Sequence, residues 1–323
     1  IYWRKASKGT RRLEMIYFKD FLKAFCKKHD LLPQGFDIAN CMPKIIIKAS
    51  EVDANPPLIE PGNWDAVMRG LKKRIKHRDN SRGKAKQPSH QNDYFNKMFY
   101  RWCMVMKNSG LRPNSELNKL RWCDVKRENV GRWSESDGGE KDKWIANIHI
   151  RESKTGRQRV VPTNGVDSQL RAWRKEQQEY IDEYFKGLEI TDDTLIFGNP
   201  SMQMKPYYYS RFSQAWIDVI NSLKGELKPY VFSNRRYTIY SMRSTFICNL
   251  ILSGKDIYTV AKLAGHTVAV CERYYALLDM GNKAKAVTDF EYGKKGKKKN
   301  EIGNYLEEIA SEKGYKLESY QHN

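Results

Sequence analysis

Apolar residues recur at helical spacing along most of the chain and alternate with polar residues in one short stretch. An apolar residue at every third or fourth position predicts an amphipathic helix, whereas strict alternation predicts a strand. We therefore expect helices at 64–76, at about 93–108, from about Ser115, at about 167–187 and at 208–223. WIANIHI (144–150) alternates, and RVVP (159–162) follows the tight turn SKTGR, which predicts a β-hairpin.

These elements predict a mainly α fold with a small antiparallel β-sheet, an α+β class. Residues 1–57 are basic with a helical pattern, and VDANPPLIEPGNW (52–64) has the Pro, Asn and Gly content of a linker. We expect 1–57 to be the C-terminal part of a helical DNA-clasping domain and 58–290 to be the main domain. Residues 291–323 contain the basic linker KKGKKK and a short amphipathic helix at about 301–311.

The charge of the chain points to a polyanionic partner. Lysine and arginine number 58 against 38 aspartates and glutamates, a formal net charge of +20. An excess of this size favours nucleic acid as the partner. No apolar run reaches the length of a membrane span. The six cysteines form no C-x-x-C pair and no zinc-type cluster with histidine, so we expect no metal and a reduced, cytoplasmic chain.

Several residues have the chemistry to exchange phosphodiester bonds. Without a metal, that reaction needs a nucleophile in line with the leaving oxygen, cations on the non-bridging oxygens and an acid for the leaving alkoxide. Arginine suits the cationic role because its planar fork stays charged and binds phosphate bidentately. The chain offers Arg112 after a turn, Lys154 in the hairpin turn, Arg243 near a helix start, His266 after a helix that Gly265 ends, and Tyr275.

The order and spacing of these residues resemble the tyrosine recombinase/integrase family, over about residues 58–285. GLRPNSELNKLRWCDV resembles the first arginine box of the family, SKTGRQRVVP its lysine hairpin, YSMRSTF its H-x-x-R box and LAGH its L-G-H box. Tyr275 lies nine residues after His266, where family members carry the nucleophile. The first box reads R-P-N-S-E, one residue longer than the commoner R-x-x-E, and Tyr240 occupies the usual histidine position.

The resemblance implies a role for each matched residue. Tyr275 would attack the scissile phosphate and form a 3′-phosphotyrosyl link, Arg112 and Arg243 would clamp the phosphate, and Lys154 would protonate the leaving 5′-oxygen. His266 would hydrogen-bond the phosphate, and Tyr240 would donate or accept a hydrogen bond there. It also implies a metal- and ATP-independent recombinase of a phage or mobile element that uses no cofactor. Its partners would be double-stranded DNA attachment sites, further copies of the chain in a tetramer on two sites, and accessory DNA-bending proteins.

Four points remain open from the sequence. Tyr274 is a rival nucleophile next to Tyr275. IYTVAKLAGHTVAVCERYY (257–275) also has the pattern of a helix-turn-helix, which would bind DNA without chemistry. A type IB topoisomerase uses a similar residue set to relax supercoils. The C-terminal helix at about 301–311 either docks on a neighbouring protomer or packs on its own domain.

Overall fold

The computed structural model describes residues 6–33, 35–46, 55–76, 89–134, 140–152, 156, 158–230 and 235–275. At positions 39, 133, 134, 140 and 273–275 it describes the backbone only. All of these residues belong to the first of two compact units of the chain, which ends at Leu277. Lys154 and the expected helix at about 301–311 lie outside the described residues.

The N-terminal part is helical, as its pattern predicts. It contains α1 (Lys8–Lys28) and the single turn α2 (Ile38–Cys41). The Ser7 side chain accepts a hydrogen bond from the Thr10 N–H and so caps the start of α1. None of the described side chains of α1 is buried, and large apolar ones such as Tyr17 and Phe21 are exposed.

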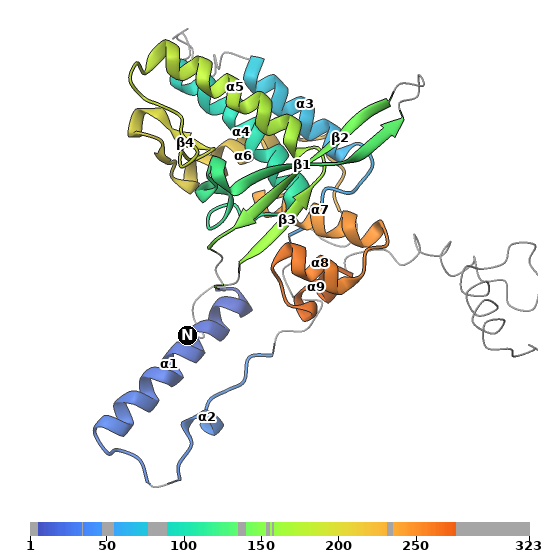
Figure 1. Ribbon diagram of the computed structural model, residues 1–323. Coiled ribbons are helices and arrows are strands. Elements are labelled where there is room, and N and C mark those ends of the chain that lie inside the picture. The colour runs from blue at the N-terminus through green and yellow to red at the C-terminus, as the bar shows by residue number, and fades with distance from the viewer. Residues whose placement is uncertain are drawn as a thin grey trace, which may run out of the picture. The chain divides into compact units, whose positions relative to one another are not determined.

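Five longer helices form the body of the fold (Figure 1). They are α3 (Asn63–Lys76), α4 (His90–Ser109), α5 (Val166–Tyr184), α6 (Tyr209–Ser222) and α7 (Ile239–Leu252). Helix α4 packs against α3, α5 and α7, and α3 also packs against α6. The helices predicted at 64–76, 93–108, 167–187 and 208–223 are therefore confirmed, with shifts of a few residues at their ends.

Three tryptophans are almost fully buried in the helical core. Each indole N–H finds an acceptor: Trp102 donates to Asn118 Oδ1, and Trp173 and Trp216 donate to backbone carbonyls. A buried indole contributes a large apolar surface without the penalty of an unpaired donor when its N–H is bonded in this way.

A three-stranded antiparallel sheet lies beside the helices, in the order β1–β2–β3 (Figure 1). Its strands are β1 (Val125–Ser134), β2 (Glu140–Ile150) and β3 (Arg159–Thr163). The predicted hairpin is confirmed as β2 and β3, whereas β1 was not foreseen. Ala146, Ile148 and Val161 share the buried face of the sheet, and α4 and α5 contact its strands.

The helix expected from Ser115 is wrong. Two short 3₁₀ turns replace it, Leu117–Lys119 and Trp122–Asp124. The N–H groups of Trp122 and Cys123 donate to the carbonyls of Thr194 and Asp192, and Leu120 O accepts from the Ile196 N–H. These bonds to a distant segment replace the i→i−4 bonds that a helix would need.

Two short helices complete the described part, α8 (Ile257–Ala264) and α9 (Val268–Tyr275). Asp256 caps the start of α8, and Gly265, with φ of 64°, ends it. Helix α8 packs against α7, α9 and β3. The observed fold is mainly helical with a small antiparallel sheet, which confirms the predicted class.

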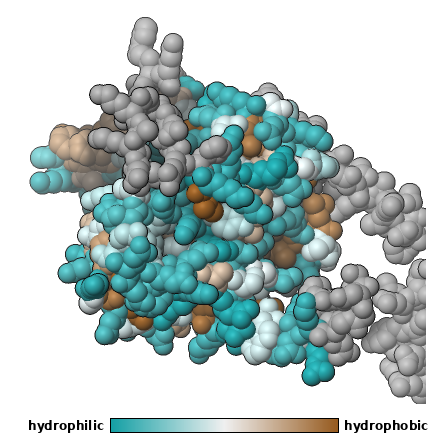
Figure 2. All heavy atoms as spheres, turned by 90° about the horizontal axis from the view of Figure 1, so that it is seen from above, coloured by the Kyte–Doolittle hydropathy of each residue, from teal (hydrophilic) through white to brown (hydrophobic). Residues whose placement is uncertain are grey.

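One face of the described surface is mostly polar (Figure 2). On the face seen in Figure 2, hydrophilic residues cover most of the described surface and hydrophobic ones are scattered among them. No helix in the described part of the chain is long and apolar enough to cross a membrane.

Candidate functional site

Three arginines from distant parts of the chain converge on the C-terminal end of α8. Arg159 Nε donates to Leu263 O at 3.0 Å, Arg243 Nη2 donates to Ala264 O, and Arg112 Nη2 donates to Gly265 O at 2.6 Å. Three consecutive carbonyls therefore each accept from a different guanidinium. The last carbonyls of a helix lack intrahelical donors and carry partial negative charge, which makes them natural acceptors for arginine. We call these three arginines, with Glu116 and His266, the arginine cradle.

Arg243 is the most deeply buried of the three, with 2% of its surface exposed, although it lies on the apolar helix α7. Its Nη1 donates to Gly110 O, and its Nη2 also meets His266 Nε2 at 2.6 Å. A buried guanidinium is stable only when carbonyls or carboxylates surround it. Arg243 therefore joins the turn before Arg112 to the turn before His266.

Glu116 lies between the other two arginines, and its side chain is fully buried. Arg112 donates to it through its backbone N–H at 2.9 Å and through Nη1 at 2.6 Å. Arg159 donates to both carboxylate oxygens, at 3.0 and 2.7 Å. Burial is the largest influence on the pKa of Glu116 and raises it, but these hydrogen bonds and charges together outweigh burial and hold the pKa below its usual value. Glu116 thus contacts Arg112 in spite of the longer spacing in the sequence.

His266 is a neutral imidazole in this environment. Burial, followed by the charges of Arg243, Arg112 and Arg159, lowers its pKa to about 3. A guanidinium can only donate, so His266 Nε2 accepts from Arg243 and the ring proton must reside on Nδ1.

The ring of His266 is expected to stay neutral, in the Nδ1–H form, down to about pH 5 in the free protein. Because its pKa is lower folded than unfolded, its contribution to stability is present above about pH 6.5 and declines as pH falls toward 3. Nitrogen-15 chemical shifts of the histidine rings measure this directly, and the His266→Gln variant identifies the signal. A titration midpoint near the ordinary histidine value would contradict the cradle geometry.

Gly110 is required where α4 turns toward Arg112. It ends α4 in the left-handed region, with φ of 62°, and an added Cβ would collide with the ring of Phe246 on α7. Both the conformation and the close approach strongly favour glycine at this position. This contact fixes the turn that presents Arg112 and whose carbonyl binds Arg243.

Gly110→Ala is expected to destabilise the fold by about 2 kcal/mol and to lower Tm by about 6 °C. Gly225→Ala is the matched control, because Gly225 has φ of 90° but no atom within 4 Å of an added Cβ. Thermal unfolding compares the two variants. Equal losses in Tm would show that the contact with Phe246 contributes nothing.

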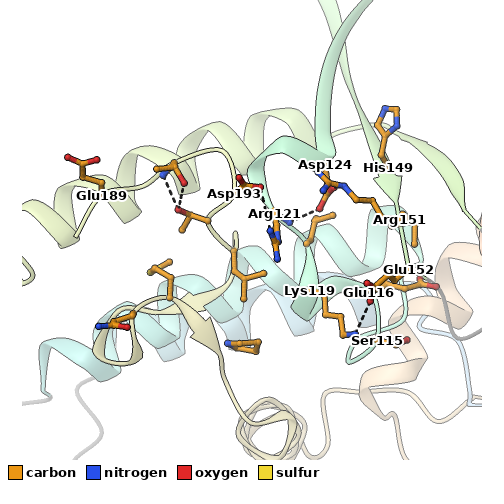
Figure 3. Close-up of a pocket in the computed structure, with 18 of the residues that line it drawn as sticks. Ser115, Glu116, Lys119, Arg121, Asp124, His149, Arg151, Glu152, Glu189 and Asp193 are labelled. Carbon is orange, nitrogen blue, oxygen red and sulfur yellow. Dashed lines mark hydrogen bonds and ion pairs between the residues drawn. The ribbon is translucent and has the colours of Figure 1, made fainter. Parts of the chain in front are cut away.

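The cradle carries an excess of positive charge, unlike the groove beside it. Three guanidiniums, one carboxylate and a neutral imidazole leave a formal charge of +2. The neighbouring groove, of about 700 Å³, has Glu116 and Ser115 at its edge (Figure 3). Its cations are paired with carboxylates: Lys119 with Glu152, Arg121 with Asp193 and Arg151 with Asp124. The cradle is therefore the better anion site of the two.

Tyr240 lies near the start of α7, three residues before Arg243. Tyr240 lines an apolar groove of about 300 Å³ between α6 and the start of α7, with Tyr209 and Trp216, and the residue is 40% exposed. Among the hydrogen bonds of the described residues, none joins the Tyr240 hydroxyl to the cradle.

Two predicted residues have no described side chain. Lys154 lies outside the described residues altogether. Helix α9 reaches Tyr275, whose side chain is not described, and packs on α7 and α8. Cys271, one turn earlier on α9, is buried, and burial raises its pKa to about 11 in spite of nearby Arg243. The thiol is therefore protonated at neutral pH and is no competing nucleophile.

The sequence prediction missed Arg159. A signal for it exists, because Arg159 and Val161 are two residues apart on β3 and so face the same side of the sheet. Val161 is an obvious core position, so a charged residue on that face needs a buried partner.

Solved structures of other proteins share the fold of this chain. No protein-family model and no curated protein sequence matches the chain. A structure of the XerH site-specific recombinase bound to palindromic difH substrate matches with a TM-score of 0.50 and 14% identity, over 76% of this chain. This chain covers 55% of the length of that protein. The Tn1549 transposon integrase in complex with circular intermediate DNA matches with a TM-score of 0.51 and 16% identity, over 88% of this chain and 80% of that one. The chain thus has the fold of the tyrosine recombinase catalytic domain.

Proposed function

We propose that the chain is a site-specific DNA recombinase or integrase that cleaves and rejoins strands through a 3′-phosphotyrosyl intermediate. The observation that supports this best is the arginine cradle, in which Arg112 and Arg243 meet neutral His266 with a net positive charge. Such a cluster of fixed donors is suited to a phosphodiester and to the charge that develops on it during transfer. The two solved structures described above are of a site-specific recombinase and a transposon integrase, each bound to DNA.

In the proposed reaction the Tyr275 phenol oxygen attacks the scissile phosphorus and loses its proton to water, and the bond from phosphorus to the 5′-oxygen breaks. Lys154 donates a proton to that leaving oxygen, while Arg112 and Arg243 hold the non-bridging oxygens. Neutral His266 donates a hydrogen bond to the phosphate. The phosphotyrosyl bond conserves the energy of the phosphodiester, so a 5′-hydroxyl of another strand reverses the attack without ATP.

The packing of α8 and α9 argues against the binding-only alternative. A helix-turn-helix presents its second helix to a DNA groove with the turn free at the surface. Here the turn between α8 and α9 is bound by Arg112 and Arg243, and both helices pack on α7. That arrangement explains the buried arginines, which a simple DNA-binding helix pair does not need.

The proposal is tested by incubating the protein, in the presence of a chelator, with nicked duplexes that carry the DNA flanking its gene. A denaturant-resistant protein–DNA adduct is expected, because the cradle supplies the positive charge that stabilises the transferred phosphate. DNA binding without any adduct would favour the binding-only alternative. Strand exchange between two such duplexes separates a recombinase from a type IB topoisomerase, which would relax supercoils and exchange nothing.

We also propose a domain organisation and a set of partners, again from the resemblance to tyrosine recombinases. Residues 1–57 form part of a DNA-clasping helical domain, consistent with the apolar side chains that α1 leaves exposed. Residues 58–290 form the catalytic domain, and 291–323 a basic linker and C-terminal helix. The partners are double-stranded DNA attachment sites and further copies of the chain, as a tetramer on two sites, with accessory DNA-bending proteins. Binding should weaken steeply with salt, because lysine and arginine dominate the charged residues.

A further inference from the structure

We propose that Arg159 is a positioning residue that locks Glu116 and the C-terminal end of α8 around Arg112. This inference rests on the proposed function, because it assigns Arg159 a part in holding the arginine that binds the phosphate. The expected site residues do not include Arg159, and nothing in its position requires that it touch the DNA.

The contacts of Arg159 connect three separate elements. The residue begins β3, donates to both oxygens of Glu116 and donates through Nε to Leu263 O. Only 8% of its side chain is exposed. Because Glu116 in turn receives two bonds from Arg112, the position of the Arg112 guanidinium depends on Arg159 through one shared carboxylate.

Gly265 shows how closely Arg159 is packed. An added Cβ at Gly265 would lie 2.7 Å from Arg159 Nη1 and 2.8 Å from its Cζ. The flat face of the guanidinium therefore lies directly against the turn that leads to His266. Arg159 therefore contacts the turn at two places, through its packing against Gly265 and through its hydrogen bond to Leu263 O.

The charge of Arg159 has a second consequence. Glu116 paired with Arg112 alone would form a neutral pair and reduce the attraction of Arg112 for a phosphate. With Arg112 and Arg159 both paired to the Glu116 carboxylate, the three side chains together keep a net positive charge and Glu116 remains ionised. Arg159 thus allows a carboxylate to hold Arg112 in place, while the site around Arg112 keeps the positive charge that attracts a phosphate.

Arg159 also connects the cradle to the hairpin turn. It is paired with Ile150 at the base of the β2–β3 hairpin, whose turn contains Lys154. Attachment of the base of the hairpin to Glu116 fixes the strand ends on either side of Lys154 in the sequence. Strand transfer needs its reacting groups held in a fixed geometry, with the nucleophile in line with the leaving oxygen.

The test compares Arg159→Gln and Arg159→Lys with Arg101→Gln. Arg101 is the matched control, because it is also largely buried and forms a two-point ion pair, with Glu176, away from the cradle. The rate of adduct formation on the nicked duplex is measured at saturating DNA, together with DNA affinity, Tm and the titration of His266.

Arg159→Gln is expected to slow adduct formation by about 100-fold with DNA affinity unchanged, whereas Arg101→Gln retains the wild-type rate. Arg159→Lys should recover part of the rate, since an ammonium can pair with Glu116 but cannot span three acceptors. The His266 titration should move upward in Arg159→Gln and stay near the wild-type midpoint in Arg159→Lys. A purely structural role would lower Tm and leave the rate of adduct formation, measured well below Tm, at its wild-type value.

Equal rates for Arg159→Gln and Arg101→Gln would overturn the inference and leave the proposed function intact. If the wild-type protein forms no adduct, the proposed function fails, and the His266 titration in the free protein then decides whether Arg159 organises the cradle. If Arg159→Gln does not fold, Gly265→Ala replaces it, with Gly254→Ala as control because Gly254 has φ of 79° and open space around it. Equal rates in that pair would also overturn the inference.

Discussion

Tyr275→Phe is expected to form no covalent adduct with a nicked DNA duplex, while it binds the same duplex as tightly as the wild-type protein. The substitution removes the phenol oxygen that the mechanism requires and retains the ring. DNA affinity depends mostly on lysine and arginine contacts with phosphates, which the substitution leaves in place. Denaturing electrophoresis measures the adduct, and a filter-binding or anisotropy titration measures affinity.

Tyr274→Phe is the matched control, because it removes the same group from the adjacent position of α9. It is expected to form the adduct normally. If Tyr274→Phe is inactive and Tyr275→Phe is active, the nucleophile is Tyr274. Adduct formation by both variants would exclude the pair and contradict the nine-residue spacing from His266 as a guide to the nucleophile.

Arg243→Lys is expected to slow adduct formation by about 10²- to 10³-fold. The variant keeps the positive charge and loses the planar fork that reaches Gly110 O, Ala264 O and His266 together. Loss of these buried hydrogen bonds should also destabilise the fold by about 2 kcal/mol. Single-turnover rates at saturating DNA, taken well below Tm, separate the catalytic effect from the stability effect.

Arg101→Lys provides the comparison for Arg243→Lys, because it makes the same exchange in an arginine that bonds Glu176 and Gln169. It is expected to retain the wild-type rate. A rate for Arg243→Lys within about threefold of that control would show that the guanidinium fork has no catalytic role.

Local patterns in the sequence were enough to predict most elements of the fold. Helices α3 to α6 follow from apolar periodicity, and the β2–β3 hairpin follows from the alternation in WIANIHI and the turn before RVVP. The turn at Gly110 and the helix end at Gly265 were also recognisable from glycine. These features depend on neighbours a few residues apart, which a single sequence displays.

What could not be predicted depends on partners far away in the chain. The segment after Ser115 has a helical pattern, but its N–H groups bond the 192–194 segment, some 70 residues later. Arg159 looked like a polar residue at the start of a strand, and its partners Glu116 and Leu263 lie 43 and 104 residues away. Strand β1, VKRENVGRWS, has four charged residues among its ten and lacks clear alternation, so its pairing with β2 could not be predicted.

The candidate site, like the fold, could be predicted from the sequence only in part. Motif spacing selected Arg112, Arg243 and His266, and the structure brings these three together. Spacing also selected Tyr240, which lines the groove between α6 and α7, and its role at the phosphate remains a prediction from the motif. The assignments of Lys154 and Tyr275 remain predictions from the motif.

The central claim is that the arginine cradle serves transfer of a DNA phosphate to Tyr275. Its most direct test is to digest the adduct formed on the nicked duplex with protease and nuclease, and to locate the nucleotide by mass spectrometry. A single modified peptide is expected, with the nucleotide on Tyr275. A nucleotide on any other residue, or a wild-type protein that binds the duplex and yields no modified peptide, would contradict it.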